Sequence, residues 1–170
     1  MKLIIINGST CSGKSTVIKS LLKERDNFFH LSYDSLKWSF SKFNADKHYK
    51  DVQKIVLETA RAIFKMGYDV LSDSTLYRES RNKLINLAKE AGYDILEINL
   101  EADFEVLVKR FDERVASALL SPERRISNLS KDRFKELFNI FNAEKSSSAI
   151  IIRTDNQSIE DVVNSVNKLL

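Results

Sequence analysis

The hydrophobic positions of this chain fall into two kinds of segment that alternate along its length. Short apolar runs rich in β-branched residues occupy 2–7, 28–32, 68–72, 93–99 and 149–153. Between these runs, apolar residues recur every three or four positions, most regularly over 52–64, 104–118 and 159–166. Nearly continuous apolar strands that alternate with amphipathic helices predict an α/β fold, in which helices cover both faces of a parallel sheet.

Two glycines and one polar pair refine the expected helix ends. Gly67 and Gly92 each follow a helical segment and each open a Gly-Tyr-Asp sequence that leads into a strand. Glycine is the usual residue just beyond a helix, so we expect both to end one. Ser158 and Asp161 have the spacing of a capping pair for the last helix.

Composition narrows the class of protein. The 170 residues suit one domain spanning 1–170, and 43% are hydrophobic, enough for a sizeable core. Four glycines, one proline and one cysteine exclude collagen, a disulfide scaffold and a multi-cysteine zinc module. A net charge of +3 is too small to indicate nucleic acid by itself. The apolar runs are too short for a membrane span or a signal sequence, so we expect a cytoplasmic protein without a membrane partner.

A phosphate-binding loop follows the first predicted strand and precedes a helical segment. The sequence from Gly8 to Ser15 reads G-x-x-x-x-G-K-S, and in this context its backbone N–H groups are expected to surround phosphate oxygens. Lys14 would bridge the β- and γ-phosphates, and the Ser15 hydroxyl would bind Mg²⁺. We therefore predict that ATP and Mg²⁺ bind here, through Gly8, Ser9, Thr10, Cys11, Ser12, Gly13, Lys14, Ser15 and Thr16.

Cys11 lies inside this loop and has two interpretations. Nearby N–H dipoles could lower the pKa of its thiol and make it reactive. Alternatively, it is a small residue that fills a tight turn.

Further acidic residues distinguish among classes of phosphate-loop protein. Asp73 ends the strand at 68–72 and is placed to hold Mg²⁺ through water. The next residue is Ser74, where many motor ATPases have a glutamate that activates water. Neither the Asn-Lys-x-Asp motif of GTPases nor the Leu-Ser-Gly-Gly-Gln signature of transporters occurs. These absences weaken the hydrolytic alternatives and favour a kinase.

A kinase needs a base for the hydroxyl that it phosphorylates. Asp34 follows the second predicted strand, at the edge of the sheet where open α/β folds bind ligands. It could accept the hydroxyl proton during transfer, and it could also serve as N-cap of a helix over 35–41. We predict the base role and leave capping open.

The segment after the fourth strand carries the arginines that a kinase would need at the transferred group. Arg110 and Arg114 lie four positions apart, on one face of the predicted helix. Positions 109–135 hold eight Lys or Arg against four acidic residues. A cationic lid over about 110–131 is one interpretation, and a solvated helix face is the other.

Several of these motifs together resemble one known family. The chain is similar to small P-loop kinases related to polynucleotide 5′-kinase domains, a wider group that includes chloramphenicol phosphotransferase and zeta-toxin kinases. The matching residues are Gly8–Thr16, Tyr33–Lys37, Leu71–Leu76 with Arg78 and Arg81, Leu87–Gly92, and Val108–Arg110 with Arg114.

The resemblance implies a P-loop kinase fold with a five-stranded parallel sheet and a helical lid. It also implies that Asp34 is the general base, that Asp73 is the second essential acid, and that Arg110 and Arg114 are lid arginines. Lys37, Asp73 and Arg78 would bind the acceptor beside Asp34. Two positions differ from the family: Lys37 stands where arginine is usual and so lacks the bidentate fork, and Phe111 replaces an asparagine.

The acceptor is the least determined part of the hypothesis. A polynucleotide 5′-hydroxyl or a nucleoside is favoured by the resemblance, and a small molecule or antibiotic is the alternative. Residues 33–49 combine five aromatic residues with lysines, which could stack a base or could form core packing. By resemblance, the loop with Thr154 and Asn156 would lie near adenine. A nucleotide-dependent switch without acceptor chemistry is the competing class.

Overall fold

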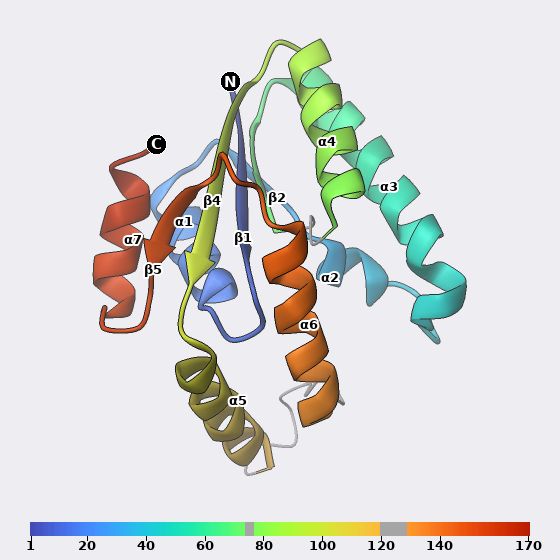
Figure 1. Ribbon diagram of the computed structural model, residues 1–170. Helices are drawn as coiled ribbons and strands as arrows, with labels where there is room; N and C mark the ends of the chain where they lie inside the picture. The colour runs from blue at the N-terminus through green and yellow to red at the C-terminus, as the bar shows by residue number, and fades with distance from the viewer. Residues whose placement is uncertain (74–76, 120–128) are drawn as a thin grey trace.

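Five parallel strands form one sheet in the computed structural model, which describes residues 1–73, 77–119 and 129–170 (Figure 1). The strands lie in the order β2-β3-β1-β4-β5, and every neighbouring pair is parallel. The predicted fold class is therefore confirmed. The strands are β1 (Lys2–Gly8), β2 (Phe28–Leu31), β3 (Asp69–Ser72), β4 (Asp94–Glu101) and β5 (Ile150–Arg153).

Helices flank the sheet and extend beyond one of its ends. In Figure 1, α3 and α4 lie on one side of the sheet, α1 and α7 lie on the other, and α5 and α6 project past the carboxyl ends of the strands. The helices are α1 (Lys14–Glu24), α2 (Tyr33–Lys37), α3 (Ala45–Met66), α4 (Arg78–Glu90), α5 (Phe104–Leu119), α6 (Lys131–Glu144) and α7 (Ile159–Asn167).

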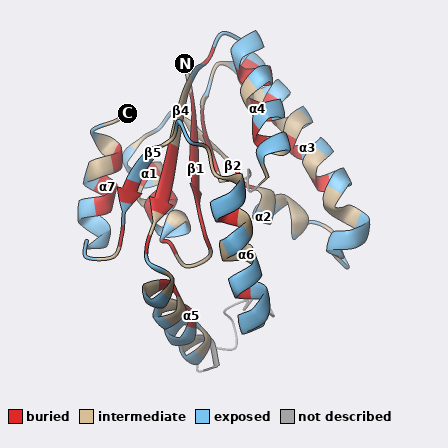
Figure 2. Cartoon of the chain, viewed as in Figure 1, coloured by how far each residue is buried: buried red, intermediate tan, exposed pale blue. Residues whose placement is uncertain are grey.

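Strand β1 lies at the centre of two hydrophobic cores because successive side chains point to opposite faces of the sheet. Leu3 and Ile5 belong to the core beneath α3 and α4, whereas Ile4 and Ile6 belong to the core beneath α1 and α7. All four side chains are fully buried, and the central strands are the most buried part of the chain (Figure 2). Because β1 is buried on both faces, the position at which the following loop begins is fixed.

A third cluster joins α5 to α6 beyond the sheet. Phe111 of α5 and Phe134 of α6 have ring centroids 4.7 Å apart, and both are buried. Helix α5 continues to Leu119, so the first part of the predicted lid, from 110 to 119, is helical. Within the predicted lid, residues 120–128, with Arg124 and Arg125, lie outside the described residues. The lid stays a prediction.

The helix ends agree with the sequence in most places. Gly67 and Gly92 each have φ of 79° at the end of a helix, and Ser158 and Asp161 form a capping box at α7. The prediction for the second helix was wrong in its boundaries. Ser32 is the N-cap of α2, where its hydroxyl accepts from Ser35 N, so Asp34 lies in the first turn and does not cap the helix.

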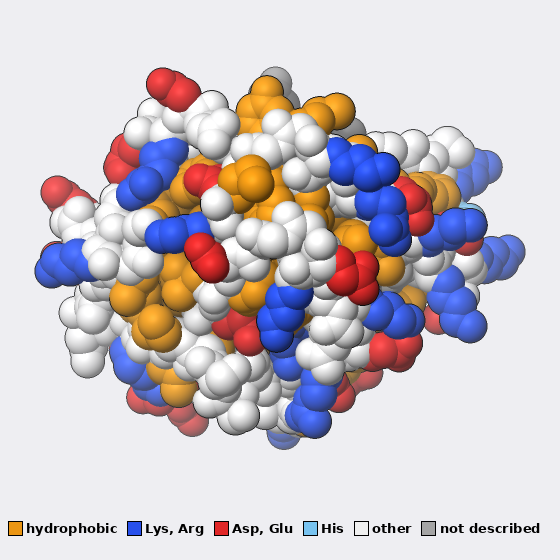
Figure 3. Space-filling view, turned by 90° about the horizontal axis from the view of Figure 1, so that it is seen from above, with side chains coloured by type: hydrophobic (Ala, Val, Ile, Leu, Met, Phe, Trp, Pro, Cys, Tyr) orange, Lys and Arg blue, Asp and Glu red, His pale blue; other side chains and the backbone are white. Residues whose placement is uncertain are grey.

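The amino ends of the strands form the opposite end of the molecule. Viewed toward this end, apolar side chains gather between lysines, arginines and acidic residues (Figure 3). Met66 and Tyr68, which flank Gly67 at the start of β3, are among the exposed apolar residues. In the described part of the chain, no helix has both the length and the apolar character needed to cross a bilayer.

Candidate functional site

The predicted site residues come from the carboxyl ends of four strands. The loop after β1 contains Lys14 at its end, Asp34 follows β2, Asp73 follows β3 and Thr154 follows β5. Since all strands are parallel, these four segments emerge at the same edge of the sheet. The parallel sheet predicted from the sequence therefore gives these segments a common edge, while the roles of the residues there stay predictions.

Close packing dictates the shape of the loop after β1. A Cβ atom at Gly8 would lie 2.4 Å from Ser12 Oγ and 2.5 Å from the Leu100 carbonyl oxygen, so only glycine fits there. Gly13 has φ of 96° and is the N-cap of α1. The loop thus leads directly into a helix N-terminus, where free N–H groups favour an anion.

Lys14 lies inside this loop. Its Nζ donates to the carbonyl oxygens of Gly8 at 2.6 Å and Ser9 at 2.9 Å. Burial lowers the pKa of the Lys14 ammonium, while the charges of Asp73 and Asp34 raise it. The two predicted carboxylates are thus close enough to Lys14 to act on its charge.

Asp73 is a nearly buried carboxylate with an unsatisfied oxygen. Its side chain is 14% exposed, and its Oδ2 lies 3.6 Å from His30 Nε2. Among the described residues, Oδ1 has no hydrogen-bond partner. A buried oxygen without a partner is costly, so the position suits a ligand that donates hydrogen bonds. The contact of His30 with Asp73 depends on how β2 and β3 pair, so the sequence alone does not reveal it.

The donors present suit a hydrated Mg²⁺ ion better than a protein-caged metal. Mg²⁺ keeps several waters and is held by one or two side chains together with substrate phosphates. The described residues contain no group of three or more His, Cys, Asp or Glu that could enclose an ion. Ser15 at the start of α1 and the free Oδ1 of Asp73 supply the kind of oxygen that such an ion would use.

Asp34 and Lys37 lie together on α2. Lys37 Nζ is 2.6 Å from Asp34 Oδ1. The Asp34 side chain is 71% exposed and Lys37 is 21% exposed, so the carboxylate is open to an incoming molecule. Tyr33 beside it is half-buried, and burial raises the pKa of this phenol to about 12.

The two arginines of α5 have different surroundings. The Arg110 guanidinium donates to Thr154 Oγ1 at 3.0 Å and to the Thr154 carbonyl oxygen. Arg114, one turn further along, is close enough to Cys11 to lower the pKa of its thiol. Arg110 is therefore hydrogen-bonded to the end of β5 and lowers the pKa of the Cys11 thiol less than Arg114 does, so Arg114 is the arginine with the stronger effect on the loop.

Cys11 matches the second of its two interpretations. It has a positive φ of 66° in the loop and packs against the cluster between α5 and α6. Burial raises the pKa of its thiol, against the smaller opposing effect of Arg114. The alternative of a thiol with a lowered pKa is wrong.

A cavity of about 250 Å³ adjoins the loop. It is bounded by the loop, by Arg110 and Thr154, and by the start of α7 at Gln157 and Ile159. Of the two loop residues predicted near adenine, Thr154 lines this cavity and Asn156 does not. The cavity thus extends from the loop after β1 to a partly apolar recess at the start of α7.

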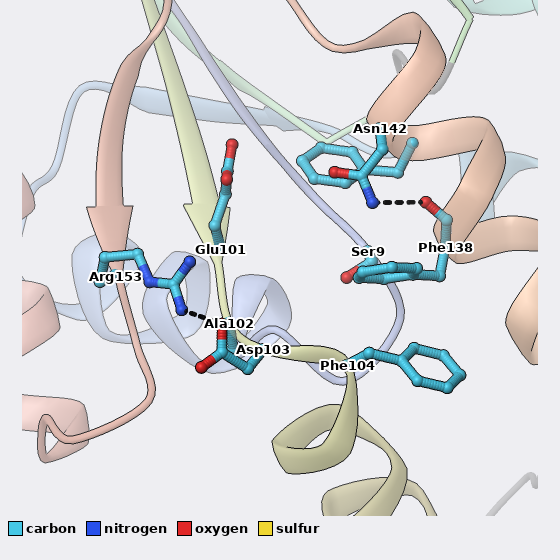
Figure 4. A pocket seen from close by; sticks show the side chains of 9 residues that line it. Ser9, Glu101, Ala102, Asp103, Phe104, Phe138, Asn142 and Arg153 are labelled. Carbon is cyan, nitrogen blue, oxygen red and sulfur yellow. Dashed lines mark hydrogen bonds and ion pairs between the residues drawn. The ribbon is translucent and has the colours of Figure 1, made fainter.

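A second cavity, of about 140 Å³, lies between β4, β5 and α6 (Figure 4). Phe104 and Phe138 line it together with Ser9 of the loop, and at its rim the Arg153 guanidinium donates to Asp103 Oδ1 at 2.6 Å. This cavity could not be predicted from the sequence, since α6 forms one wall and the position of α6 depends on tertiary packing.

Arg78 has contacts other than those expected. Its backbone N–H donates to Glu144 Oε2 at 2.9 Å, and its guanidinium donates to the Ala143 carbonyl oxygen at 3.0 Å. These bonds attach the start of α4 to the end of α6. The role of Arg78 in acceptor binding stays a prediction.

A protein-family model and a known nucleotide-binding protein both match this chain. A model of the AAA domain family matches residues 3–137. A nucleotide-binding protein of Clostridium acetobutylicum is 28% identical over 95% of this chain. The alignment spans 52% of that relative, so the chain corresponds to about half of its length.

Two solved structures share the fold. A candidate kinase of Chloroflexus aurantiacus has a TM-score of 0.70 at 17% identity, covering 99% of this chain and 94% of that one. A chain of the Pnkp1/Rnl/Hen1 RNA repair complex has a TM-score of 0.67 at 21% identity, covering 84% of this chain and 44% of that one. At these identities, the likeness establishes the fold.

Proposed function

The chain belongs to the AAA domain family, and from this premise we propose that it is an ATP- and Mg²⁺-dependent kinase that phosphorylates an acceptor hydroxyl. The observation that carries the proposal is the pair of carboxylates near Lys14. Asp73 and Asp34 both raise the pKa of the loop ammonium, yet they differ in exposure. The nearly buried carboxylate of Asp73 suits a metal ion, and the exposed carboxylate of Asp34 suits a substrate.

The nucleotide would extend from the loop toward the start of α7. Its phosphates would meet Lys14 and the N–H groups at the start of α1. Its base and ribose would occupy the cavity beside Thr154 and Ile159, where Arg110 is held. The name of the Clostridium acetobutylicum relative, a nucleotide-binding protein, supports the binding of a nucleotide.

Ser15 and Asp73 would hold the Mg²⁺ ion. When bound, the ion would neutralise charge on the β- and γ-phosphates. The unsatisfied Oδ1 of Asp73 supports this role, because water molecules around the ion would donate to it.

Asp34 would carry out the proton transfer. As the acceptor oxygen bonds to the γ-phosphorus, its proton passes to the Asp34 carboxylate, and the bond from phosphorus to the β–γ bridging oxygen breaks to release ADP. Lys14 and Arg114 would offset the charge that develops on the transferred group. The exposure of Asp34, at 71%, leaves room for a hydroxyl to approach.

The acceptor that we favour is a polynucleotide 5′-hydroxyl or a nucleoside. The structural likeness to a chain of an RNA repair complex supports this choice. A small-molecule or antibiotic acceptor remains the alternative within the same chemistry.

Replacement of Asp34 tests the proposed base. Asp34→Asn removes the proton acceptor with little change in shape, so we expect transfer from γ-labelled ATP to the acceptor to fall by about 10²- to 10⁴-fold. The affinity for ATP should stay near that of the wild type. Asp46→Asn is the matched control, since Asp46 is an exposed acid in the first turn of α3.

Two results would contradict the assignment. If Asp34→Asn transferred phosphate at the wild-type rate, Asp34 would not be the base. If the wild type transferred phosphate to no hydroxyl acceptor and changed conformation on binding ATP, the protein would be a nucleotide-dependent switch.

A further inference from the structure

Helices α4 and α6 cap each other's ends. Within the described residues, the side chain of Tyr77, the N-cap of α4, makes no capping hydrogen bond. The carboxylate of Glu144, the last residue of α6, takes that place and accepts from the Arg78 backbone N–H at 2.9 Å. In the other direction, the Arg78 guanidinium donates to the Ala143 carbonyl oxygen at 3.0 Å. The Arg81 guanidinium donates to the Glu144 carbonyl oxygen at 2.9 Å.

This reciprocal contact matches the needs of both helix ends. The first N–H groups and the last carbonyl groups of a helix lack partners inside the helix. A helix N-terminus favours a negative charge, and a C-terminus favours a positive one. Glu144 supplies the first to α4, and Arg78 and Arg81 supply the second to α6. The contact therefore fixes the end of α6 beside the start of α4 (Figure 1).

Helix α6 in turn packs, together with α5, against the phosphate-binding loop. The rings of Phe138 of α6 and Phe104 of α5 have centroids 4.9 Å apart. Cys11 of the loop packs against the same cluster between α5 and α6. Arg114 of α5 is close enough to Cys11 to lower the pKa of its thiol. The placement of α6 thus bears on how α5 and Arg114 lie against the loop.

We propose that Arg78 is a positioning residue that, together with Glu144, holds α6 and thereby keeps α5 and Arg114 against the phosphate-binding loop. The inference rests on the proposed kinase function, in which Arg114 offsets charge on the transferred group. It gives Arg78 a role different from the acceptor binding that the family resemblance implies. The bond of its guanidinium to the main chain of α6 supports the positioning role.

A second ion pair limits the size of the expected effect. Lys145, which follows α6, has its Nζ 2.9 Å from Glu101 Oε1 of β4. Loss of the Arg78 bond should therefore loosen α6 without releasing it. From the usual contribution of a single hydrogen bond, we expect changes of about five- to tenfold.

The reactivity of Cys11 tests the inference without a nucleotide or an acceptor. Cys11 is the single cysteine of the chain, so the rate of its alkylation by N-ethylmaleimide reports how closely the α5–α6 cluster covers the loop. Arg78→Met and Glu144→Ala should each raise this rate about five- to tenfold. The double variant should add little, because both changes break one contact. Arg78→Lys, which keeps the positive charge, should restore most of the protection.

Two control variants separate this effect from a general loss of stability. Lys83→Met removes an exposed charge from the same helix. Tyr93→Phe removes two hydrogen bonds in the core beneath α3 and α4, to the carbonyl oxygens of Phe64 and Tyr68. Both should leave the alkylation rate near wild type. The inference is overturned if Arg78→Met and Glu144→Ala react at the wild-type rate, or if Tyr93→Phe accelerates the reaction equally.

Kinetics distinguish positioning from acceptor binding. Arg78→Met should lower kcat about five- to tenfold and leave the KM for the acceptor near wild type. A raised KM for the acceptor with an unchanged alkylation rate would overturn the inference and favour the acceptor role. If the wild type phosphorylates no hydroxyl acceptor while Arg78→Met and Glu144→Ala expose Cys11, the proposed function fails and the positioning of α6 by Arg78 stands.

Discussion

Arg81 is a buried charged residue of helix α4. Its side chain is 3% exposed, and Nε lies 3.2 Å from Glu97 Oε2 of β4. Its guanidinium also donates to the Glu144 carbonyl oxygen at 2.9 Å, so it joins α4, β4 and the end of α6. Burial lowers the pKa of Arg81, and the charge of Glu97 acts against this. The pair therefore contributes to the fold rather than to phosphate binding.

Removal of Arg81 should destabilise the protein strongly. Arg81→Met leaves Glu97 as a buried carboxylate without its ion-pair partner, which typically costs about 3–5 kcal/mol of unfolding free energy. Lys83→Met is the control on the same helix, because Lys83 is 58% exposed in its pair with Glu79. Urea unfolding at neutral pH measures both. Equal midpoints for the two variants would show that the buried pair is unimportant.

The residues that the sequence failed to explain depend on contacts between distant segments. The loop from Gly8 to Ser15 could be identified because its motif is local and its neighbours in the chain are a strand and a helix. The contact of His30 with Asp73 and the pair of Arg81 with Glu97 join different elements. No spacing along the chain reveals such pairs.

Helix α5 carries two arginines whose surroundings differ, although the sequence suggested one shared role for them. Arg110 and Arg114 share one face, but Arg110 is bonded to Thr154 after β5 and Arg114 lies near Cys11. Under the proposed function, Arg110 therefore belongs to the side of the nucleotide base, and Arg114 belongs to the side of the phosphates.

This separation predicts different kinetic effects for the two arginines. Arg114→Ala should lower kcat by about 10²-fold or more, since a charge that stabilises the transferring group is lost. Arg110→Ala should act mainly on the KM for ATP, because it opens the cavity beside Thr154. Steady-state kinetics against ATP measure both variants. The opposite assignment of kcat and KM effects would contradict the geometry.

Element boundaries were predictable to the extent that periodicity and end signals were clear. The first residue of each of the five strands lies within one or two residues of the start of the expected apolar run. The capping box of α7 is present as predicted. Helix α2 was misplaced because it spans only Tyr33–Lys37, too short to show a helical period. Its true N-cap, Ser32, directly follows the last residue of β2.

In the whole molecule, the two hydrophobic cores lie on opposite faces of the sheet and share strand β1. Leu3 and Ile5 face one core while Ile4 and Ile6 face the other, so neither core can open without β1. Alternation of strands and helices was enough to predict this parallel sheet. The order β2-β3-β1-β4-β5 sets which strand ends are neighbours, and it follows from packing of the whole chain.

The shared strand predicts that residues 1–170 unfold as one domain. Scanning calorimetry should give a single transition whose calorimetric and van't Hoff enthalpies agree. Two resolved transitions would mean that the third cluster, between α5 and α6, unfolds separately from the sheet.

The central claim is that the γ-phosphoryl group of ATP passes to a hydroxyl acceptor. The most direct measurement follows label from γ-labelled ATP in the presence of Mg²⁺ and an oligonucleotide with a free 5′-hydroxyl, a nucleoside, or a small hydroxylated antibiotic. We expect label to appear on an acceptor, omission of Mg²⁺ to abolish the transfer, and Asp34→Asn to lower it by about 10²- to 10⁴-fold. Label found only in inorganic phosphate, or only in unreacted ATP, with every acceptor would contradict it.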